Sequence, residues 1–300
     1  MAIITRSTHP SDLWPGIYDH FGNKYKALPN QWGQVFEKGR STKAYEQLVE
    51  TTTFGLASVK PEGQSIVYDV DAEGYKTTLT HVVYGLGYIV TREENEDNQY
   101  LEVSKRRSAN LAYSMRTTAE YVHWNILNRA FSTSYPIGDG AALVSAAHPT
   151  MAGNASNLLT AADLSETSLE DAMKLIMAAK NSRGLPIAVG VRRIIVPVSE
   201  AFNAQRILKT NLRPGTANND INAIKAMGLV PEVVVSNYLT DPDAFFIQTD
   251  IPDGLMSLWR REVELEQDND FDTENLKAKA TMRFAAGIGD WRAIWGNAGA

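Results

Sequence analysis

A long run of helix-forming residues is the feature that most constrains how this chain can fold. From about Asn98 to Phe131 the sequence contains neither glycine nor proline. Apolar or small side chains recur every three or four residues along this run, which predicts the buried face of an amphipathic helix. They are Leu101, Ser104, Ser108, Leu111, Met115, Ala119, Val122 and Ile126, joined near the end by Trp124, Leu127 and Phe131. Charged side chains are expected largely off that face: Lys105, Arg106, Arg107, Arg116 and Glu120.

The residues before this run predict where the helix begins. Thr91 and Glu94 have the spacing of a capping box, and the acidic residues around them suit the positive end of a helix dipole. We therefore expect a helix over about 92–131. A helix of roughly 34 residues is about 50 Å long, and a compact chain of 300 residues has a diameter of roughly the same size. Either the helix is broken, or the subunit is flat and elongated around it.

A β-rich segment precedes the helix, from Ser65 to Val90. Apolar residues alternate with polar ones from Ile66 to Val70, and the run Tyr75 to Tyr84 is rich in threonine and β-branched residues. We expect these two runs to form a hairpin around a turn at Asp71–Gly74. A hairpin of this kind is marginally stable alone in water. It must lie on its own core or on a neighbouring subunit.

The remaining sequence predicts a mixed α/β body. The stretch up to about Lys60 is either an extended arm with short helical turns or an N-terminal part of the core, and Ser132–Leu164 reads as a surface crossing or domain junction. The expected later elements are a helix from Ser168 that ends before Gly184, a strand Arg193–Val198, a helix Ser199–Leu208, strands Glu232–Ser236 and Ala244–Thr249, a long hairpin of Leu258–Glu266 with Asn275–Ala286, and a last strand Trp291–Trp295.

Composition excludes several classes of protein. Hydrophobic residues make up 44% and charged residues 21%, which excludes wholesale disorder. The net charge of −6 disfavours a dedicated nucleic-acid binder. The chain has no cysteine, which removes disulfides, thiolate metal sites and cysteine nucleophiles and fits a reducing cytoplasm. No signal peptide and no apolar run of about 18 residues is found, so we expect no membrane span.

A search for catalytic or cofactor motifs yields little. Gly85-Leu-Gly87 lacks the third glycine of a dinucleotide loop and predicts a bulge or a close approach of strands. His123 lies beside the apolar helix face and is expected to pack in the core. His148 has no obvious carboxylate partner nearby in sequence. No P-loop, Gly-x-Ser-x-Gly or His-Glu-x-x-His string occurs.

Three aspartates have the spacing of a calcium loop. Asp268, Asp270 and Asp272 match its first three ligand positions, but Thr273 stands where glycine is needed and Lys279 where a bidentate carboxylate is needed. A solvated hairpin turn is the interpretation we favour.

Several strings in a fixed order give the chain a family resemblance. They are Tyr84-Gly-Leu-Gly-Tyr-Ile-Val-Thr91, Leu143-Val-Ser-Ala-Ala-His-Pro149, Ser156-Asn-Leu-Leu-Thr-Ala-Ala-Asp163, Tyr238-Leu-Thr-Asp-Pro-Asp-Ala-Phe-Phe246, and the tail Asp270-Phe-Asp-Thr-Glu-Asn-Leu-Lys-Ala-Lys with Arg283 and Gly289-Asp-Trp-Arg292. With the order of the predicted elements, they resemble the major capsid proteins of tailed phages, which share the Hong Kong 97-like fold. The resemblance is strongest to the Mu-like major head subunits and covers nearly the whole chain.

The resemblance implies an α+β fold divided into segments. These are an N-arm (1–53), an E-loop hairpin over a neighbouring subunit (54–90), a peripheral domain with a spine helix and a crossing segment (91–159), a mixed α/β axial domain (160–256), and C-terminal strands of the peripheral domain (257–300). The residues expected at contacts between subunits are Trp14, Tyr18, Tyr68, Asp71, Glu73, Tyr75 and Lys76. No catalytic, cofactor-binding or metal-binding residue is implied.

The resemblance also implies a function and a set of partners. The chain is expected to be a structural protein that assembles with itself into hexamers and pentamers of an icosahedral shell. The shell would be built in the host bacterial cytoplasm and would enclose double-stranded DNA through weak, non-specific contacts. Because no long extension precedes the arm, we expect a separate scaffolding protein, together with a portal protein and a cement protein as further partners.

Two alternatives remain. One is an encapsulin-like compartment shell with the same fold. The other is a soluble α/β enzyme whose site gathers dispersed residues such as His148, Asp163 and Arg183.

Overall fold

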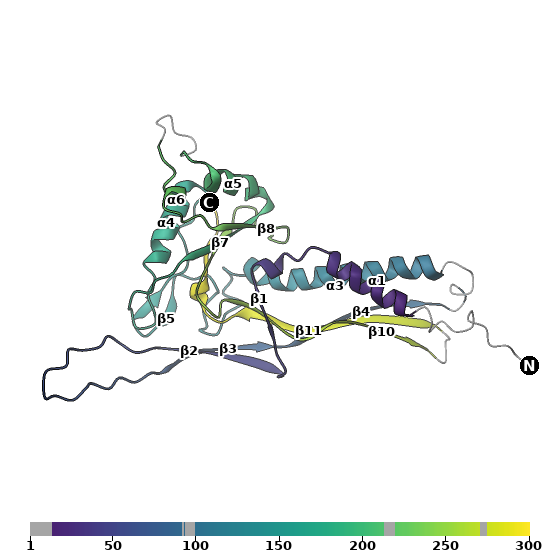
Figure 1. Ribbon diagram of the computed structural model, residues 1–300, viewed down its shortest axis with the longest axis horizontal. Helices are drawn as coiled ribbons and strands as arrows, with labels where there is room; N and C mark the ends of the chain where they lie inside the picture. The colour runs from purple at the N-terminus through teal and green to yellow at the C-terminus, as the bar shows by residue number, and fades with distance from the viewer. Residues whose placement is uncertain (1–13, 92, 94–99, 213–219, 271–274) are drawn as a thin grey trace, which may run out of the picture.

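The structure, a computed structural model, describes residues 14–91, 93, 100–212, 220–270 and 275–300. It has three parts, which Figure 1 shows together: a long body at the right, an upper lobe, and a hairpin that projects at the lower left. Two clusters of buried apolar side chains fill the body and the lobe. The subunit is therefore elongated, as one of the two interpretations of the long helix requires.

The long body is a helix lying on a four-stranded sheet. Helix α3 (Tyr100–Asn128) runs unbroken for 29 residues, about 43 Å at 1.5 Å per residue. The strand order of the sheet is β1-β10-β11-β4, with β1 parallel to β10 and the other pairs antiparallel. The strand bounds are Glu37–Arg40 for β1, Val82–Val90 for β4, Leu255–Asn269 for β10 and Leu276–Ile288 for β11. Apart from residue 93, the predicted start of the helix lies outside the described residues.

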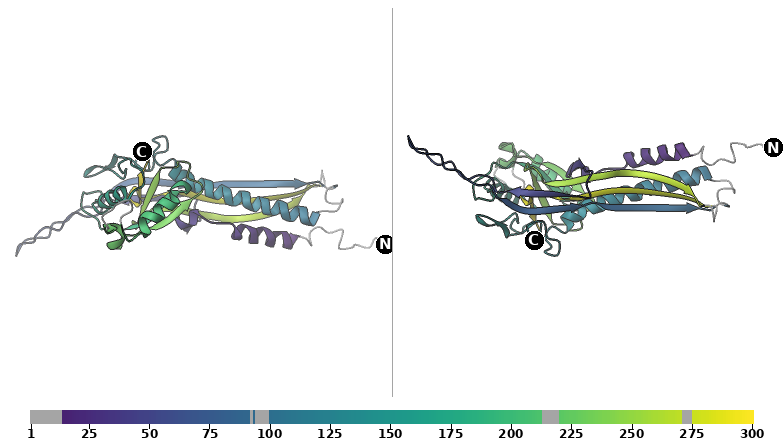
Figure 2. Two further views of the ribbon diagram at one scale, coloured as in Figure 1. Left: turned by 90° about the horizontal axis from the view of Figure 1, so that it is seen from above. Right: turned by 90° about the horizontal axis from the view of Figure 1, so that it is seen from below.

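The N-terminal stretch is part of this core rather than an extended arm. Helix α1 (Trp14–Ala27) lies alongside α3, as Figure 2 shows from two sides. A single turn of 3-10 helix, η3 (Trp32–Gln34), follows it. Phe21, Trp32 and Phe36 are buried. Of the two alternatives for this stretch, the structure supports the core.

Glu120 corrects the predicted helix face. We expected its carboxylate off the buried side, but the residue is only 1% exposed. Its two oxygens accept the backbone N–H groups of Gln31 (2.9 Å) and Trp32 (3.0 Å), and Oε2 also accepts the indole N–H of Trp124 (2.9 Å). Burial raises the pKa of this carboxyl. A charged residue was placed inside because the unpaired N–H groups of η3 need an acceptor there.

His123 is a core residue, as predicted. Its ring is buried, stacks on Trp32 and Phe284, and bonds to the Ala119 carbonyl and the Ser257 hydroxyl. Burial lowers its pKa to about 4. Gly87, from the glycine pair, lies within β4, and a Cβ built there would stand 2.7 Å from the Ala278 carbonyl oxygen, so the predicted close approach of strands is confirmed.

The upper lobe is a second four-stranded sheet with helices on it. The strand order is β12-β9-β7-β8. The bounds are Val191–Pro197 for β7, Glu232–Ser236 for β8, Phe245–Thr249 for β9, Ile294–Asn297 for β12, Glu166–Met177 for α4, Ala201–Lys209 for α5 and Ala223–Ala226 for α6. Two single turns, η4 (Val198–Glu200) and η5 (Trp291–Ala293), precede α5 and β12. A small pair, β5 (His148–Thr150) with β6 (Gly153–Ala155), lies in the crossing segment.

Two predicted boundaries in this lobe are wrong. Helix α4 begins a turn earlier than expected, because Ser165 is its N-cap and Ser168 stands at the third helical position of the capping box. The expected last strand begins at Ile294, not Trp291, because residues 291–293 form η5. Strand β12 pairs with β9 of the upper lobe, although it falls in the segment 257–300 that was expected to supply strands to the peripheral domain.

The projecting hairpin differs from the predicted one. It pairs β2 (Tyr45–Thr51) with β3 (Glu73–Thr80), and residues 52–72 continue beyond the strands as two limbs (Figure 1). The predicted turn at Asp71–Gly74 is wrong, because Glu73 and Gly74 already belong to β3. A turn instead joins the limbs where Gln64 N–H donates to the Pro61 carbonyl. The missing limb was hidden because Tyr45–Thr51 alternates in burial yet carries few β-branched residues.

The predicted strand Tyr75–Tyr84 is also divided. It breaks at His81 into β3 of the hairpin and β4 of the body sheet. Among the described helices, none is long and apolar enough to span a membrane.

Candidate functional site

The limbs of the projecting hairpin carry an exposed row of large apolar side chains. Their exposed fractions run from 62% to 91%: Phe54, Leu56, Val59, Ile66, Val67, Tyr68 and Val70. No strand is assigned in residues 52–72, although the run from Ile66 to Val70 has a strong β preference. An apolar surface of this kind on a soluble chain marks a site of interaction with another molecule.

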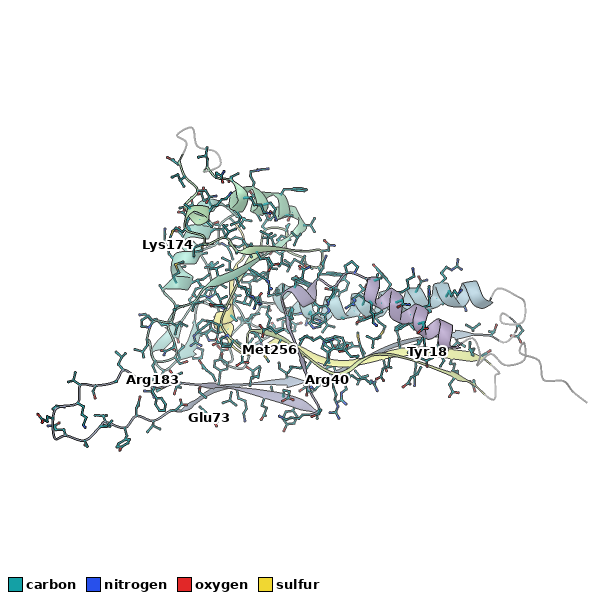
Figure 3. The ribbon with its side chains drawn as sticks, viewed as in Figure 1. Tyr18, Arg40, Glu73, Lys174, Arg183 and Met256 are labelled. Atoms are coloured by element: carbon teal, nitrogen blue, oxygen red, sulfur yellow. The ribbon has the colours of Figure 1, made fainter. Side chains whose placement is uncertain are left out.

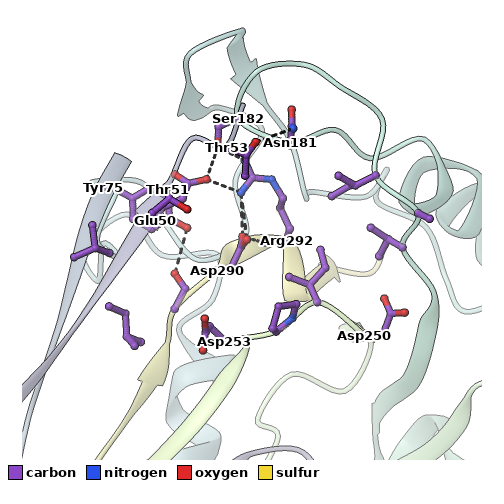
Figure 4. Close-up of a pocket in the computed structure, with 18 of the residues that line it drawn as sticks. Glu50, Thr51, Thr53, Tyr75, Asn181, Ser182, Asp250, Asp253, Asp290 and Arg292 are labelled. Atoms are coloured by element: carbon purple, nitrogen blue, oxygen red, sulfur yellow. Dashed lines mark hydrogen bonds and ion pairs between the residues drawn. The ribbon is translucent and has the colours of Figure 1, made fainter. Parts of the chain in front are cut away.

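The base of the hairpin is fixed by a buried polar cluster around Arg292, which we call the Arg292 cluster. Figure 4 shows Glu50 of β2, Ser182 of the loop after α4, and Asp290 and Arg292 of the tail turned towards one another. The Arg292 guanidinium lies 2.9 Å from a Glu50 oxygen and 3.2 Å from an Asp290 oxygen. Nε and Nη2 of Arg292 donate to the Lys180 carbonyl and the Ser182 hydroxyl. The Ser182 hydroxyl also donates to Glu50.

Tyr75 joins the hairpin to the same tail. Its hydroxyl donates to the Gly289 carbonyl at 3.2 Å, and burial, followed by the nearby charge of Asp290, raises the pKa of the phenol. Burial also raises the pKa of the Asp290 carboxyl, while Arg292 opposes that shift. Glycine is required beside this contact, because a Cβ at Gly289 would lie 2.5 Å from the Asp253 carbonyl oxygen.

A second set of contacts fixes the limbs farther out. Arg183 pairs with Asp69 at 2.7 Å and donates to the Val70 carbonyl; Figure 3 shows Arg183 beside the limbs. Asp69 also accepts the N–H groups of Gly55 and Val70, and these bonds together with Arg183 lower its pKa. The hairpin is thus held in one direction by the upper lobe and the tail of its own subunit.

A cavity of about 630 Å³ lies at the hairpin base, beside the Arg292 cluster. It is bounded by carboxylates, by Tyr75 and by aliphatic side chains of β2 and of the segments around Val189 and Ile251. No group of three or more metal-ligating side chains occurs among the described residues. The arrangement offers no nucleophile with an adjacent base, so its evident role is to position the hairpin.

The structure places the predicted contact residues in different surroundings. Tyr68 is 90% exposed on a limb. Asp71 accepts the Thr52 hydroxyl at 3.2 Å, and Lys76 is exposed on β3 opposite Val49. Tyr75 is occupied within its own subunit.

Three further predicted residues complete this set. Glu73 begins β3 opposite Thr51. Tyr18 is 43% exposed on α1. Trp14 is the first residue of α1, and its side chain lies outside the described ones. Contacts between subunits at these residues stay predictions.

Sequence reasoning missed the Arg292 cluster. Glu50, Ser182 and Arg292 are separated by more than one hundred residues, and charged residues at such spacing give no local pattern. The available signal was the string Gly289-Asp-Trp-Arg292, which contains both the close backbone approach and the two tail charges.

The residues of the enzyme alternative are not brought into one site. His148 is fully buried, stacks on Trp291, and bonds to Asp139 and Asn157. Arg183 pairs with Asp69 of the limbs, and Asp163 is exposed before α4. The carboxylate partner of His148 was present nine residues earlier in the sequence and was overlooked.

The calcium-like aspartates lie at the end of the β10–β11 hairpin. Asp268 is in β10, Asp270 pairs with Lys277, and Asp272 lies outside the described residues. The ion pair fits the hairpin-turn interpretation rather than a calcium site.

Comparison with solved structures defines the class of protein. Mycobacterium phage Patience gives a TM-score of 0.57 at 10% identity, covering 99% of this chain and 90% of that one. Microbacterium phage Oxtober96 gives 0.54 at 11% identity, covering 91% and 93%, and a virus-like particle from Pyrococcus furiosus gives 0.52 at 12%, covering 95% and 99%. The fold is that of the Hong Kong 97-like shell proteins, as the resemblance predicted.

The family is shown by sequence. The profile of the phage capsid protein family matches residues 74–297, which is most of the chain. No curated protein matches the chain. The chain belongs to the phage capsid protein family, and it is a structural protein of the phage capsid.

Proposed function

We propose that this chain forms the phage shell as hexamers and pentamers, with the projecting hairpin of each subunit lying over its neighbour. The observation that carries this proposal is the exposed apolar row on residues 52–72, held outwards by Arg183 and the Arg292 cluster. Covering such side chains contributes roughly 25 cal/mol for each Å² of apolar surface removed from water. A head-to-tail contact of this kind closes into rings of five or six subunits when the rotation permits.

The segments implied by the resemblance are proposed to match the three parts of the molecule. The long body corresponds to the peripheral domain with α3 as the spine helix, the upper lobe to the axial domain at the symmetry axes, and the hairpin to the E-loop. Strand pairing supports a loop that begins with β2 at Tyr45 rather than at residue 54, and it supports a tail shared between both domains.

The partners of the shell are part of the same proposal. A scaffolding protein, a portal protein, a cement protein and packaged double-stranded DNA are those that the resemblance implies, and assembly would take place in the host bacterial cytoplasm. The net charge of −6 favours weak contact with DNA, because a basic inner wall would bind phosphates tightly. An encapsulin-like compartment has the same fold, but the family match to phage capsid proteins favours a virion.

The experiment compares assembly of wild type with a variant whose exposed row is polar. In the variant, Leu56, Val59, Ile66, Val67 and Tyr68 become serine or threonine, so that Arg183 and the Arg292 cluster keep their partners. A matched control replaces three exposed apolar residues of β4, namely Val83, Leu86 and Ile89, by threonine.

Light scattering and negative-stain microscopy measure the products, and circular dichroism checks that each variant folds. We expect shells or rings from wild type and folded, unassembled subunits from the hairpin variant. Normal shells from the hairpin variant would contradict the proposal. Loss of assembly in the β4 control alone would place the contact on the body sheet instead.

A further inference from the structure

The hairpin is connected to the body at a single residue, His81. Strand β3 ends at Thr80 and β4 begins at Val82, and these strands belong to different sheets. The other connection, residues 41–44, lies beside it, because the N–H of His81 donates to the Ala44 carbonyl at 3.3 Å. Any change in the direction of the hairpin must therefore pass through the backbone around His81.

The His81 side chain is buried without a hydrogen-bond partner. The residue is 5% exposed, and neither ring nitrogen is bonded among the described residues. Buried polar atoms in native proteins are nearly always bonded, so an imidazole left without partners at a connecting residue calls for an explanation.

The charges that face His81 come from three elements. Arg260 lies on β10 and Arg283 on β11, and both disfavour a proton on the ring, while Glu46 on β2 favours it. Glu46 already accepts the Ser41 hydroxyl at 2.7 Å and the Lys43 ammonium at 3.1 Å. Nε of Arg283 is buried and also lacks a partner. The surroundings of the ring are thus cationic and cannot supply a free counter-charge.

We propose that His81 is a proton-controlled hinge, which keeps the hairpin against the body while the ring is neutral and releases it when the ring is protonated. A neutral imidazole fits the closed arrangement because it adds no charge beside Arg260 and Arg283. A protonated ring needs water or a carboxylate, and it reaches them only if the strand connection opens. The hinge acts on the direction of the hairpin, whatever the hairpin later contacts.

The direction of the pH effect follows from the pKa of the two arrangements. Burial, then Arg283 and Arg260, lower the pKa of His81 below its ordinary 6.5 in the closed arrangement. In the open arrangement the solvated ring returns towards the ordinary value. The closed arrangement is therefore fully favoured above about pH 6.5 and loses up to about tenfold in population for each pH unit below it, until the lowered pKa is reached.

Hydrogen exchange of the hairpin tests this directly. Amide exchange of residues 45–51 and 73–80 is measured by mass spectrometry on the unassembled chain at pH 7.5 and 5.5, with correction for the intrinsic pH dependence of exchange. We expect wild type to lose protection in these strands by up to about tenfold at pH 5.5, with α3 unchanged. His81→Gln, which cannot titrate, should lose this response, and His20→Gln on α1 should retain it.

Two further variants keep the test decisive if His81→Gln does not fold. Removing a cation with Arg260→Gln raises the pKa of the closed ring and should weaken the response, whereas removing the anion with Glu46→Gln should strengthen it. Arg260 is exposed, so its replacement leaves the core intact. A pH response of wild-type size in His81→Gln, or in both charge variants, would overturn the hinge. Because the measurement uses unassembled chain, its result is independent of whether the hairpin contacts a neighbour.

Discussion

Replacing Arg292 by methionine tests whether the Arg292 cluster holds the hairpin. The arginine side chain is 4% exposed, and the carboxylates of Glu50 and Asp290 are 15% and 24% exposed. Methionine fills similar volume but leaves these two carboxylates facing each other without a counter-charge. Breaking a buried ion pair in this way costs 3–5 kcal/mol, and the partial exposure of both acids indicates about 3 kcal/mol. A loss of that size is a large share of the 5–15 kcal/mol that stabilises a typical domain.

The assay is urea unfolding of the unassembled chain. Lys174→Met is the matched control, because Lys174 pairs with Asp171 on the open surface of α4 and should change stability by less than about 0.5 kcal/mol. The double variant Arg292→Met, Glu50→Gln removes one of the stranded charges and should recover about 1 kcal/mol or more. Strict additivity of the two single changes, or an Arg292→Met that is as stable as the Lys174 control, would refute the assignment of the cluster.

The pH dependence of the same variant has a defined sign. Arg292 is the main influence that opposes the rise in the pKa of Asp290, so its loss raises that pKa further. A carboxyl whose folded pKa exceeds its unfolded pKa binds more protons in the folded state. The instability of Arg292→Met should therefore be greatest at neutral pH and shrink as the pH falls through the raised pKa. Unfolding at pH 7.5 and pH 5 measures this difference.

Two other substitutions test the body and the hairpin base. Met115→Pro removes a backbone donor in the middle of α3 and should cost about 3 kcal/mol or more, with loss of helical circular dichroism; a soluble variant with unchanged spectrum would show that α3 is not continuous. Gly138→Ala places a methyl group 2.2 Å from the Thr77 hydroxyl and 2.8 Å from the Lys76 carbonyl oxygen, and should destabilise by about 1–3 kcal/mol in urea unfolding. Gly22→Ala, in open space on α1, is its control and should stabilise by about 0.5–1 kcal/mol; equal effects of the two alanines would contradict the close contact at Gly138.

Local patterns predicted the elements whose residues repeat with one period. Helix α3 and the β10–β11 hairpin followed from side-chain spacing alone, since each buries one face over many residues. The projecting hairpin failed because its pattern is not local. Residues Ile66–Val70 have strand preference but no partner in the subunit, while β2 has a partner and weak preference. Preference without pairing indicates a surface for another molecule, and nothing in the sequence of one chain specifies that molecule.

Buried charge was the other source of error. Glu120 and Arg292 were expected at or near the surface, yet both are almost fully buried. Each lies where backbone or carboxylate groups from distant segments need a partner: two N–H groups of the turn at Gln31 and Trp32, and the acids Glu50 and Asp290. Such positions depend on the tertiary arrangement, so neither charge nor helical periodicity reveals them.

The tail explains why the hairpin and the two cores form one unit. Strand β11 ends in the body sheet at Ile288, and β12 begins in the sheet of the upper lobe at Ile294. The few residues between them contain Asp290 and Arg292, which bind β2 of the hairpin. The direction of the hairpin is thus fixed against both lobes at the point where they join. A substitution there should move the hairpin relative to both lobes, and assembly should respond to it more strongly than the stability of either core.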